Sequence, residues 1–293
     1  MLLINNVRSC VLLATPVLFY STFMVLSTRL DSASIPHETS DSNPRDTSES
    51  HTPGWKSIDV FFGVRDNITV DSSQANQTEA VLSILNFKRN GYFVDLAANE
   101  AFLFSNSFYL EEMFGWSGLC IEANPLYWNS LSQRRCKVVA AAVGNLTMEE
   151  VRFRIDNEVY GGLVGESFDN KMPRKRRPRF AREKIAKMFT VSLHAIFLKF
   201  NVPDVIDYMS LDVEGAEELI LSDFPFNKYR FTILTIERPS DKLKNILFQN
   251  GYKFVRQITS WGETFWINLE VEVELNMTYF DDHFLTNFSK YYI

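Results

Sequence analysis

The chain has 293 residues, of which 46% are hydrophobic and 23% are charged, and its formal net charge is −6. This composition is typical of a globular protein, and the length is sufficient for one large domain of catalytic size with a substantial core. Three cysteines are too few for the disulfide framework of a small secreted scaffold, so that class is excluded.

An apolar segment near the N-terminus predicts a membrane anchor. Residues 9–28 contain no charged side chain and reach the roughly 20 residues that a membrane-spanning helix needs. Arg8 precedes the segment, whereas Arg29 on its other side is offset by Asp31, so the weak positive bias places the N-terminus in the cytosol. We expect residues 1–29 to form a signal anchor of a single-pass type II membrane protein. A cleaved signal peptide, which would give a secreted protein, is the alternative.

Glycosylation sequons support a lumenal location for the remainder of the chain. Five Asn-X-Ser/Thr sequons follow the predicted anchor, more than chance would usually place in one chain, and this pattern indicates the lumen of the Golgi or endoplasmic reticulum. The acceptor residues are Asn67, Asn76, Asn145, Asn276 and Asn287.

A polar segment separates the anchor from the globular domain. Residues 30–54 are rich in Ser, Asp, Thr, Glu and Pro and show no apolar periodicity, so they predict a disordered stem. The globular domain is predicted to span residues 55–293.

Short apolar runs alternate with helix-like segments in this domain. Nearly continuous apolar strands that alternate with helices indicate an α/β fold, with a mostly parallel sheet covered by helices on both faces. The predicted strands are residues 92–96, 118–123, 137–143, 206–211, 231–237, 252–257 and 264–269, with an extra strand at 151–155. The predicted helices are residues 105–114, capped by Ser105 or Asn106, 125–134, 216–221, and 241–250, capped by Ser240.

Two of the cysteines lie in or beside predicted buried strands. Cys120 and Cys136 could form a disulfide in an oxidising lumen, and burial as two small hydrophobic side chains is at least as compatible with the sequence.

A strongly basic run interrupts the alternation of strands and helices. Residues 171–187 contain nine Lys or Arg and one Glu, so the rest of the chain is strongly acidic. The simplest interpretation is a solvated insertion loop that continues into a helix. The functional interpretation is a patch for an acidic substrate, an anionic glycan or a lipid head group.

Carboxylates follow three of the predicted strands. Asp95 ends the first strand, Glu122 follows the second, and Asp212 and Glu214 follow the strand at 206–211. Because open parallel sheets bind ligands beyond the carboxyl ends of their strands, these side chains predict a ligand site there. Glu122 has the spacing at which such folds bind two ribose hydroxyls. For each carboxylate taken alone, the alternative is an N-cap of the next helix.

Two phrases of the sequence together resemble a known family. YFVDLAANEAFLFSNSFYLEEMFGWSGLCIEANP and IDYMSLDVEGAEELIL are similar to motifs of the FkbM family of S-adenosylmethionine-dependent methyltransferases, whose members chiefly methylate hydroxyl oxygens. The resemblance covers roughly residues 91–269. It implies a Rossmann-like methyltransferase fold, with a seven-stranded sheet whose last strand runs antiparallel, and S-adenosylmethionine as the cofactor.

The resemblance also assigns roles to individual residues. It implies that Asp95 and Asn99 line the methionine end of the cofactor and that Glu122 binds the ribose hydroxyls. Asp212 and Glu214 would face the methyl acceptor, and either is a candidate base for the acceptor's proton. The same motifs assign Ala97 and Asn124 to the cofactor site.

The cofactor loop departs from the family's pattern at two positions. The family's loop usually reads D-x-G-A-N-x-G, and its two glycines are replaced here by Ala97 and Ala101. Each replacement adds a methyl group and narrows the backbone angles that the residue can adopt, so we expect weakened cofactor binding.

The sequence therefore predicts an O-methyltransferase of the secretory pathway that acts on a glycan or a related hydroxyl compound, which the basic run suggests is acidic. We expect no metal ion and no nucleic-acid partner, and a membrane contact only through the anchor. One alternative is a non-catalytic methyltransferase-fold protein that binds partners. Another is a type II glycosyltransferase that uses Asp212-Val213-Glu214 to bind a metal ion and a sugar nucleotide.

Overall fold

The computed structural model describes residues 59–61, 73, 75–155, 161–165, 168 and 184–277, all within one compact unit, residues 50–293. The predicted anchor and stem, the sequon residues Asn67 and Asn287, and residues 171–183 of the basic run lie outside the described residues. In the part of the chain that is described, none of the helices combines the length and apolarity that crossing a bilayer requires.

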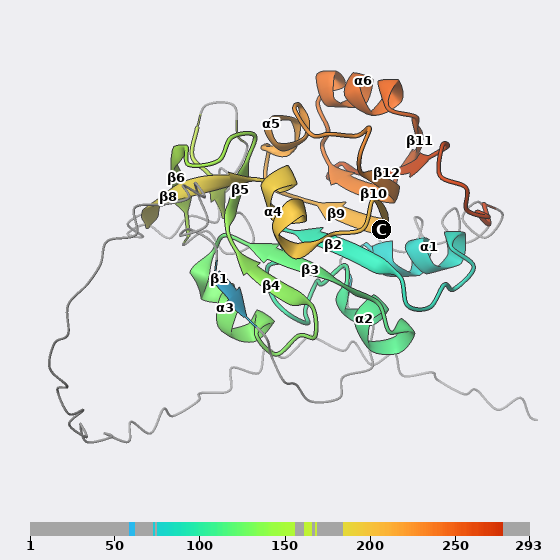
Figure 1. The fold of residues 1–293 in the computed structure, drawn as a ribbon, viewed down its shortest axis with the longest axis horizontal. Helices are drawn as coiled ribbons and strands as arrows, with labels where there is room; N and C mark the ends of the chain where they lie inside the picture. Colours follow the sequence, from blue (N-terminus) through green and yellow to red (C-terminus); the bar gives the residue numbers. More distant parts are fainter. Residues whose placement is uncertain are drawn as a thin grey trace, which may run out of the picture. The chain divides into compact units, whose positions relative to one another are not determined.

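A large sheet forms the centre of the domain (Figure 1). The pairs β4–β3, β3–β2, β2–β9 and β9–β10 are parallel, and β12 runs antiparallel to both of its neighbours. The predicted α/β class, the mostly parallel sheet and the antiparallel last strand are therefore confirmed. In spatial order the strands are β1 (Asp59–Phe61), β4 (Lys137–Ala140), β3 (Ser117–Glu122), β2 (Tyr92–Leu96), β9 (Val205–Leu211), β10 (Arg230–Glu237), β12 (Glu263–Asn268) and β11 (Tyr252–Gln257).

The sheet has eight strands, whereas seven were expected. The additional strand β1 pairs antiparallel with β4, from Asp59 opposite Ala140 to Phe61 opposite Val138. An edge strand leaves backbone N–H and C=O groups unpaired, and a short segment that pairs with them satisfies those groups. The prediction missed β1 because a three-residue strand carries too little alternation to be recognised.

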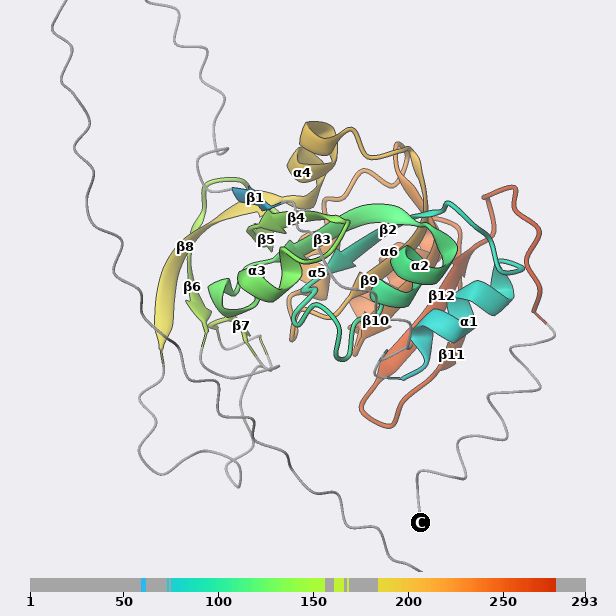
Figure 2. The same cartoon turned by 90° about the horizontal axis from the view of Figure 1, so that it is seen from below.

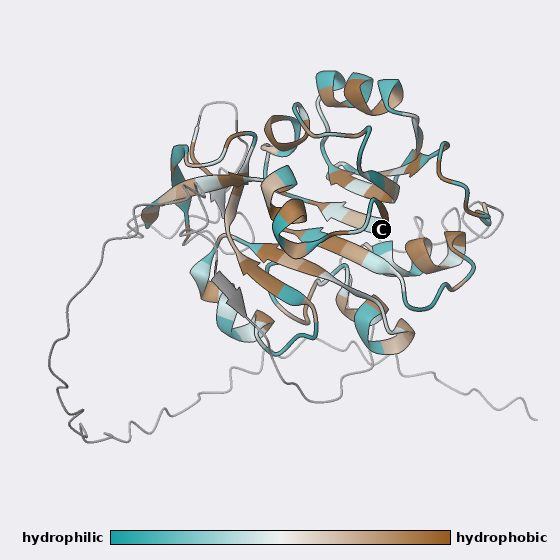
Figure 3. Ribbon diagram, viewed as in Figure 1, coloured by the Kyte–Doolittle hydropathy of each residue, from teal (hydrophilic) through white to brown (hydrophobic). Residues whose placement is uncertain are grey.

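Helices cover both faces of the sheet, as predicted. One hydrophobic core contains side chains of α4 (Leu193–Phe200), α5 (Glu217–Leu221) and α6 (Asp241–Gln249), and the other contains side chains of α1 (Gln77–Ile84), α2 (Phe108–Phe114) and α3 (Pro125–Leu131). Figure 2 shows α1, α2 and α3 together on the near side of the sheet. The central strands are mainly hydrophobic, and α6 carries a polar and an apolar face (Figure 3).

A second, four-stranded sheet was not expected. Its order is β5 (Ala142–Gly144), β8 (Ile185–Ser192), β6 (Glu150–Arg154) and β7 (Gly162–Leu163). The predicted strand 137–143 is split at Ala141, because its second part leaves the main sheet and pairs with β8. The end of the basic run continues into strand β8 and not into a helix, because each residue from Ile185 to Phe189 pairs with a residue of the facing antiparallel strand β6.

Helix α2 begins three residues later than predicted. Its N-cap is Ser107, whose hydroxyl donates to the Asp95 carboxylate and makes no capping bond. Ser105 accepts from the Phe108 backbone N–H at 3.1 Å. The cap that Ser240 was expected to provide is confirmed, since its hydroxyl accepts from the Leu243 N–H at 3.1 Å.

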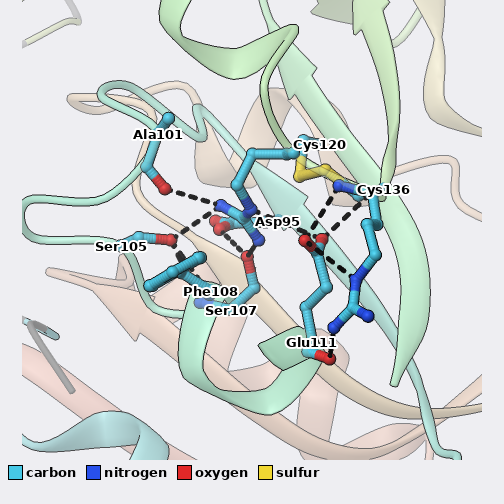
Figure 4. The surroundings of a disulfide bond; sticks show 10 residues. Asp95, Ala101, Ser105, Ser107, Phe108, Glu111, Cys120 and Cys136 are labelled. Carbon is cyan, nitrogen blue, oxygen red and sulfur yellow. Dashed lines mark hydrogen bonds and ion pairs between the residues drawn. A yellow bond between two sulfur atoms is a disulfide. The ribbon is translucent and has the colours of Figure 1, made fainter. Parts of the chain in front are cut away.

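Cys120 and Cys136 form a disulfide, with their Cα atoms 6.0 Å apart. Cys120 lies in β3 and Cys136 directly precedes β4, so the bond links two adjacent parallel strands on their helix α2 side (Figure 4). Of the two alternatives left open by the sequence, the structure contains the pair.

Candidate active site

A cavity of about 660 Å³ lies at the carboxyl ends of β2, β3, β9 and β10. This volume is within the range of about 300–1,000 Å³ that is typical of small-molecule sites. The smaller sheet contributes Phe153 and Leu163 to its wall. The sequence-predicted residues that line it are Asp95, Ala97, Asn99, Glu122, Asn124, Asp212 and Glu214.

The register of the parallel strands explains why these residues meet. Leu96 lies opposite Ile121 on one side of β2 and opposite Leu211 on the other. The three strands therefore end at the same level, and the residues that follow them emerge side by side. Asp95, Glu122 and Asp212 are thus brought to one edge of the sheet, as the sequence predicted.

The loop after β2 has an unusual backbone. Ala97 has φ 64° and Asn99 has φ 53°, both in the left-handed region. Asparagine tolerates this region, but an alanine there costs about 1–2 kcal/mol because its Cβ approaches the following carbonyl. Ala97 lies at a position where the FkbM motif has glycine. The backbone constraint that the sequence predicted for this alanine is therefore present. Ala101, at the second such position, has no positive φ and is fully buried.

Glu122 connects the loop to the second strand. One carboxylate oxygen accepts from the Asn99 N–H at 2.8 Å, and the other accepts from the Asn124 N–H at 2.6 Å. Burial raises the pKa of Glu122 to about 7, although these backbone hydrogen bonds oppose the shift. Glu122 therefore orders the loop directly and presents a carboxylate whose charge changes near neutral pH.

Asn124 lies at the cavity wall, but its side chain is used by the fold. Its oxygen caps helix α3 by accepting from the Leu126 N–H at 3.1 Å, and its nitrogen donates to the Ile155 carbonyl at 3.2 Å. Any contact of Asn124 with a ligand would therefore involve its backbone or an edge of its amide.

Asp95 is 4% exposed and accepts a short hydrogen bond from the Ser107 hydroxyl. Burial raises its pKa, while the Ser107 bond and the nearby Arg134 guanidinium lower it. The carboxylate is consequently oriented on one side by protein groups and lines the cavity on the other.

The far end of the cavity carries three further carboxylates. Oxygens of Asp212, Glu214 and Glu237 lie within 4.8 Å of one another. Arg238 donates to Glu214 at 3.0 Å and also to Glu237. Burial, together with the adjacent Asp212 carboxylate, raises the pKa of Glu237 well above its usual range.

These three carboxylates have the oxygen ligands that a divalent cation prefers. Arg238 forms ion pairs with two of them and offsets part of their negative charge. The expectation that the protein binds no metal ion stays a prediction.

Exposed aromatic side chains border the cavity. Trp261, in the turn between β11 and β12, is 42% exposed, and Phe104, beyond the cofactor loop, is 51% exposed. Large apolar side chains that remain exposed beside a cavity are typical of ligand contacts.

Sequence reasoning missed most of the other cavity residues, and three of them matter for its chemistry. Glu237 ends strand β10 and would have been found by the same rule that identified Asp95 and Glu122. Arg238 follows it directly. Trp261 carried no signal, because only the hairpin of β11 and β12 brings it back to the cavity.

The protein-family model of the methyltransferase FkbM domain matches residues 95–262 of this chain. The match begins at the cofactor-loop aspartate and ends after the turn that carries Trp261, so it includes every cavity residue named above. A search of curated proteins gave no significant match.

Two solved structures resemble the chain weakly, both with a TM-score of 0.35. One is the METTL16 MTase domain, 12% identical, with 66% of this chain and 65% of that chain covered. The other is the precorrin-6y C5,15-methyltransferase from Geobacter metallireducens GS-15, 14% identical, with 71% of this chain and 92% of that chain covered. At this level of similarity they carry no argument about the site.

The backbone of the cofactor loop yields a prediction about its alanines. Ala97→Gly should keep or raise the free energy of unfolding, by up to about 1 kcal/mol, because glycine adopts φ 64° without strain. Ala101→Gly is the matched control and should lower it by about 1 kcal/mol, since a buried methyl is lost and the unfolded chain gains freedom. Urea denaturation of both variants measures the difference. Equal destabilisation would contradict the assigned loop geometry.

Proposed function

This chain belongs to the FkbM methyltransferase family, and we propose that it is an S-adenosylmethionine-dependent O-methyltransferase that acts in the secretory pathway on a hydroxyl of a glycan or a related compound. One observation carries the proposal. The cavity at the carboxyl ends of β2, β3 and β9 is lined on one side by Glu122, whose position suits a ribose. It is lined on the other side by a cluster of carboxylates that includes Asp212.

The residues on one side of the cavity suit the cofactor. The Glu122 carboxylate retains lone pairs for two ribose hydroxyls, and such charge-assisted hydrogen bonds are about twice as strong as neutral ones. Asp95 and Asn99 lie beside it and would hold the methionine end. When bound, S-adenosylmethionine supplies an already activated methyl group, so the protein has to align the acceptor and accept its proton.

Asp212 is the favoured base. Glu214 accepts a hydrogen bond from Arg238, and burial and the Asp212 carboxylate raise the pKa of Glu237, which favours its protonated form, so neither is as well suited to accept a proton. Asp212 directly follows β9, next to the cofactor loop, and lines the cavity. In the proposed reaction Asp212 would accept the proton of the acceptor hydroxyl, and bound S-adenosylmethionine would supply the methyl group.

The acceptor side of the cavity supports a sugar. The flat apolar ring of Trp261 can pack against the C–H face of a pyranose, while carboxylates accept hydrogen bonds from its hydroxyls. The basic run at residues 171–187 would attract an acidic sugar, so we propose an acidic acceptor.

The first prediction tests the cofactor. The parent protein should bind S-adenosylmethionine, and Glu122→Ala should weaken binding about 100-fold or more, because two charge-assisted hydrogen bonds are lost. The parent's affinity should also rise up to about tenfold from pH 6 to pH 8, as Glu122 ionises through its pKa of about 7. Calorimetry at several pH values measures both effects.

A matched control is provided by Glu217. Burial also raises its pKa to about 7, but its carboxylate accepts from the Val213 and Gly215 N–H groups and faces the loop after β9. Glu217→Gln should retain the rise in affinity from pH 6 to pH 8, whereas Glu122→Gln should remove the part of that rise that Glu122 causes. A parent that does not bind the cofactor would instead favour the non-catalytic binding protein.

The second prediction concerns the base. Asp212→Asn should keep cofactor affinity within a few-fold and reduce methyl transfer by about 10²–10⁴-fold, since an amide preserves the shape but cannot accept the proton. Single-turnover transfer to a glycan acceptor measures the rate. Parallel loss of affinity and transfer would make Asp212 a cofactor ligand and leave Glu214 as the base, and a parental rate in both amide variants would refute the assignment.

The third prediction concerns location, which we propose to be the Golgi or endoplasmic reticulum lumen through an N-terminal type II anchor. The apolar segment and the sequons support this, as does the disulfide, because disulfides persist mainly in oxidising compartments. Asn76 is exposed. Treatment of protein from cells with an N-glycosidase should increase its mobility, and Cys120 and Cys136 should resist alkylation before reduction. An unshifted band with two reactive thiols would refute a lumenal domain.

A further inference from the structure

A buried arginine lies behind the cofactor loop, away from the cavity. The Arg134 side chain is completely buried, at the turn between α3 and β4. Its guanidinium donates to the Ala101 carbonyl at 2.9 Å and to the Ser105 hydroxyl at 3.0 Å. It also donates to the Ser107 hydroxyl at 3.1 Å and forms an ion pair with Glu111 at 3.4 Å.

The Ser107 hydroxyl transmits this charge to the site. It accepts from Arg134 and donates its own proton to Asp95, so the three groups form a continuous chain from the guanidinium to a cavity-lining carboxylate. The hydrogen bond from Arg134 to the Ala101 carbonyl holds the other end of the loop 101–107. Figure 4 shows Asp95, Ala101, Ser105, Ser107 and Glu111 converging beside the disulfide.

The segment that carries Arg134 is held firmly. The Glu111 carboxylate accepts from the Arg135 N–H at 2.8 Å and from the Cys136 N–H at 2.9 Å. Cys136 is bonded to Cys120, and Cys120 is the register partner of Asp95 in the adjacent strand. The disulfide therefore links the segment that carries Arg134 to Cys120, the neighbour of Asp95 in the adjacent strand.

Stability alone does not explain an arginine at this place. Moving a guanidinium from water into a protein interior costs several kcal/mol, and a buried ion pair is often no more stable than apolar residues of similar size. Here, however, three of its donated hydrogen bonds go to the loop 101–107, which leads from the cofactor loop into α2.

We propose that Arg134 is a positioning residue of the cofactor site, which acts through Ser107 on the Asp95 carboxylate and through the Ala101 carbonyl on the loop. The proposal rests on the proposed cofactor. It adds to the motif residues a group that touches no ligand and lies outside both quoted phrases.

A positioning role differs from a structural one in its pH dependence. The Ser107 hydrogen bond and the Arg134 charge both lower the pKa of Asp95, against burial and the Asp212 charge. Loss of either should therefore move protonation of Asp95, and the fall of cofactor affinity on acidification, to higher pH. The titratable or charged groups that face Asp95 are Arg134 with its partner Glu111, Glu122 of β3, Tyr208 of β9 and Asp212.

The test uses the full chain with S-adenosylmethionine as the probe, measured by calorimetry from pH 5 to pH 8, together with thermal unfolding. Ser107→Ala cuts the link to Asp95 and retains the Arg134–Glu111 pair, so we expect a folded protein with roughly tenfold weaker binding at pH 7. The acid-side fall in affinity should move to higher pH. Arg134→Met should weaken binding further, and Arg134→Lys should restore part of the loss because it retains the charge.

Arg135→Gln is the matched control. Arg135 contacts the same helix through the Glu112 carboxylate at 3.1 Å and the Glu111 carbonyl at 2.7 Å, but its side chain is 54% exposed and it donates nothing to the loop 101–107. This variant should bind the cofactor within about twofold of the parent. If Arg134→Met does not fold, Ser107→Ala decides the question.

If the parent binds the cofactor and Ser107→Ala binds it with the same affinity and the same pH profile, the inference is overturned. The proposed function is then unaffected. A parent that does not bind the cofactor would refute the proposed function. Hydrogen exchange of the loop amides 97–103 then tests Arg134 separately, with faster exchange expected in Ser107→Ala and in Arg134→Lys than in Arg135→Gln. Equal exchange rates would overturn the inference in that case.

Discussion

The parallel hydrogen bonding of β2 with β3 on one side and with β9 on the other is the constraint on which the site depends. It brings three strand ends to the same level, so that Asp95, Glu122 and Asp212 meet around one cavity. Because the sheet is covered on both faces, these carboxylates are poorly hydrated, and burial is the largest cause of the raised pKa of Asp95 and of Glu122. The same packing thus creates both the position and the chemistry of the site.

Two arginines offset this concentration of negative charge from opposite ends. Arg134 lies behind the loop and reaches Asp95 through a hydroxyl, whereas Arg238 contacts Glu214 and Glu237 directly. The Arg134 side chain is fully buried, and the Arg238 side chain is 41% exposed. Arg134 is therefore enclosed by protein groups, whereas Arg238 remains accessible to solvent.

The left-handed turn at Ala97 persists because its neighbours determine it. The Ala97 and Ala98 N–H groups both donate to the Ile121 carbonyl, and the Asn99 N–H donates to Glu122. Unfavourable backbone conformations are retained where surrounding contacts over-determine them, and they are common at ligand sites. The strain of one alanine is therefore compatible with a cofactor loop.

Much of this protein could be predicted from its sequence. Periodicity, strand length and helix caps located the main-sheet strands other than β1 and four of the helices, but not α1, α4 or β8. The rule that parallel strands bind ligands at their carboxyl ends located Asp95, Glu122 and Asp212. These are local properties, since a strand, a cap or a carboxylate after a strand is readable within about ten residues. The paired state of Cys120 and Cys136, the second sheet, the arginine beneath the loop and the return of Trp261 to the cavity were decided only by the tertiary structure. Each depends on segments far apart in the chain, and their contacts form only when the sheet order places them together.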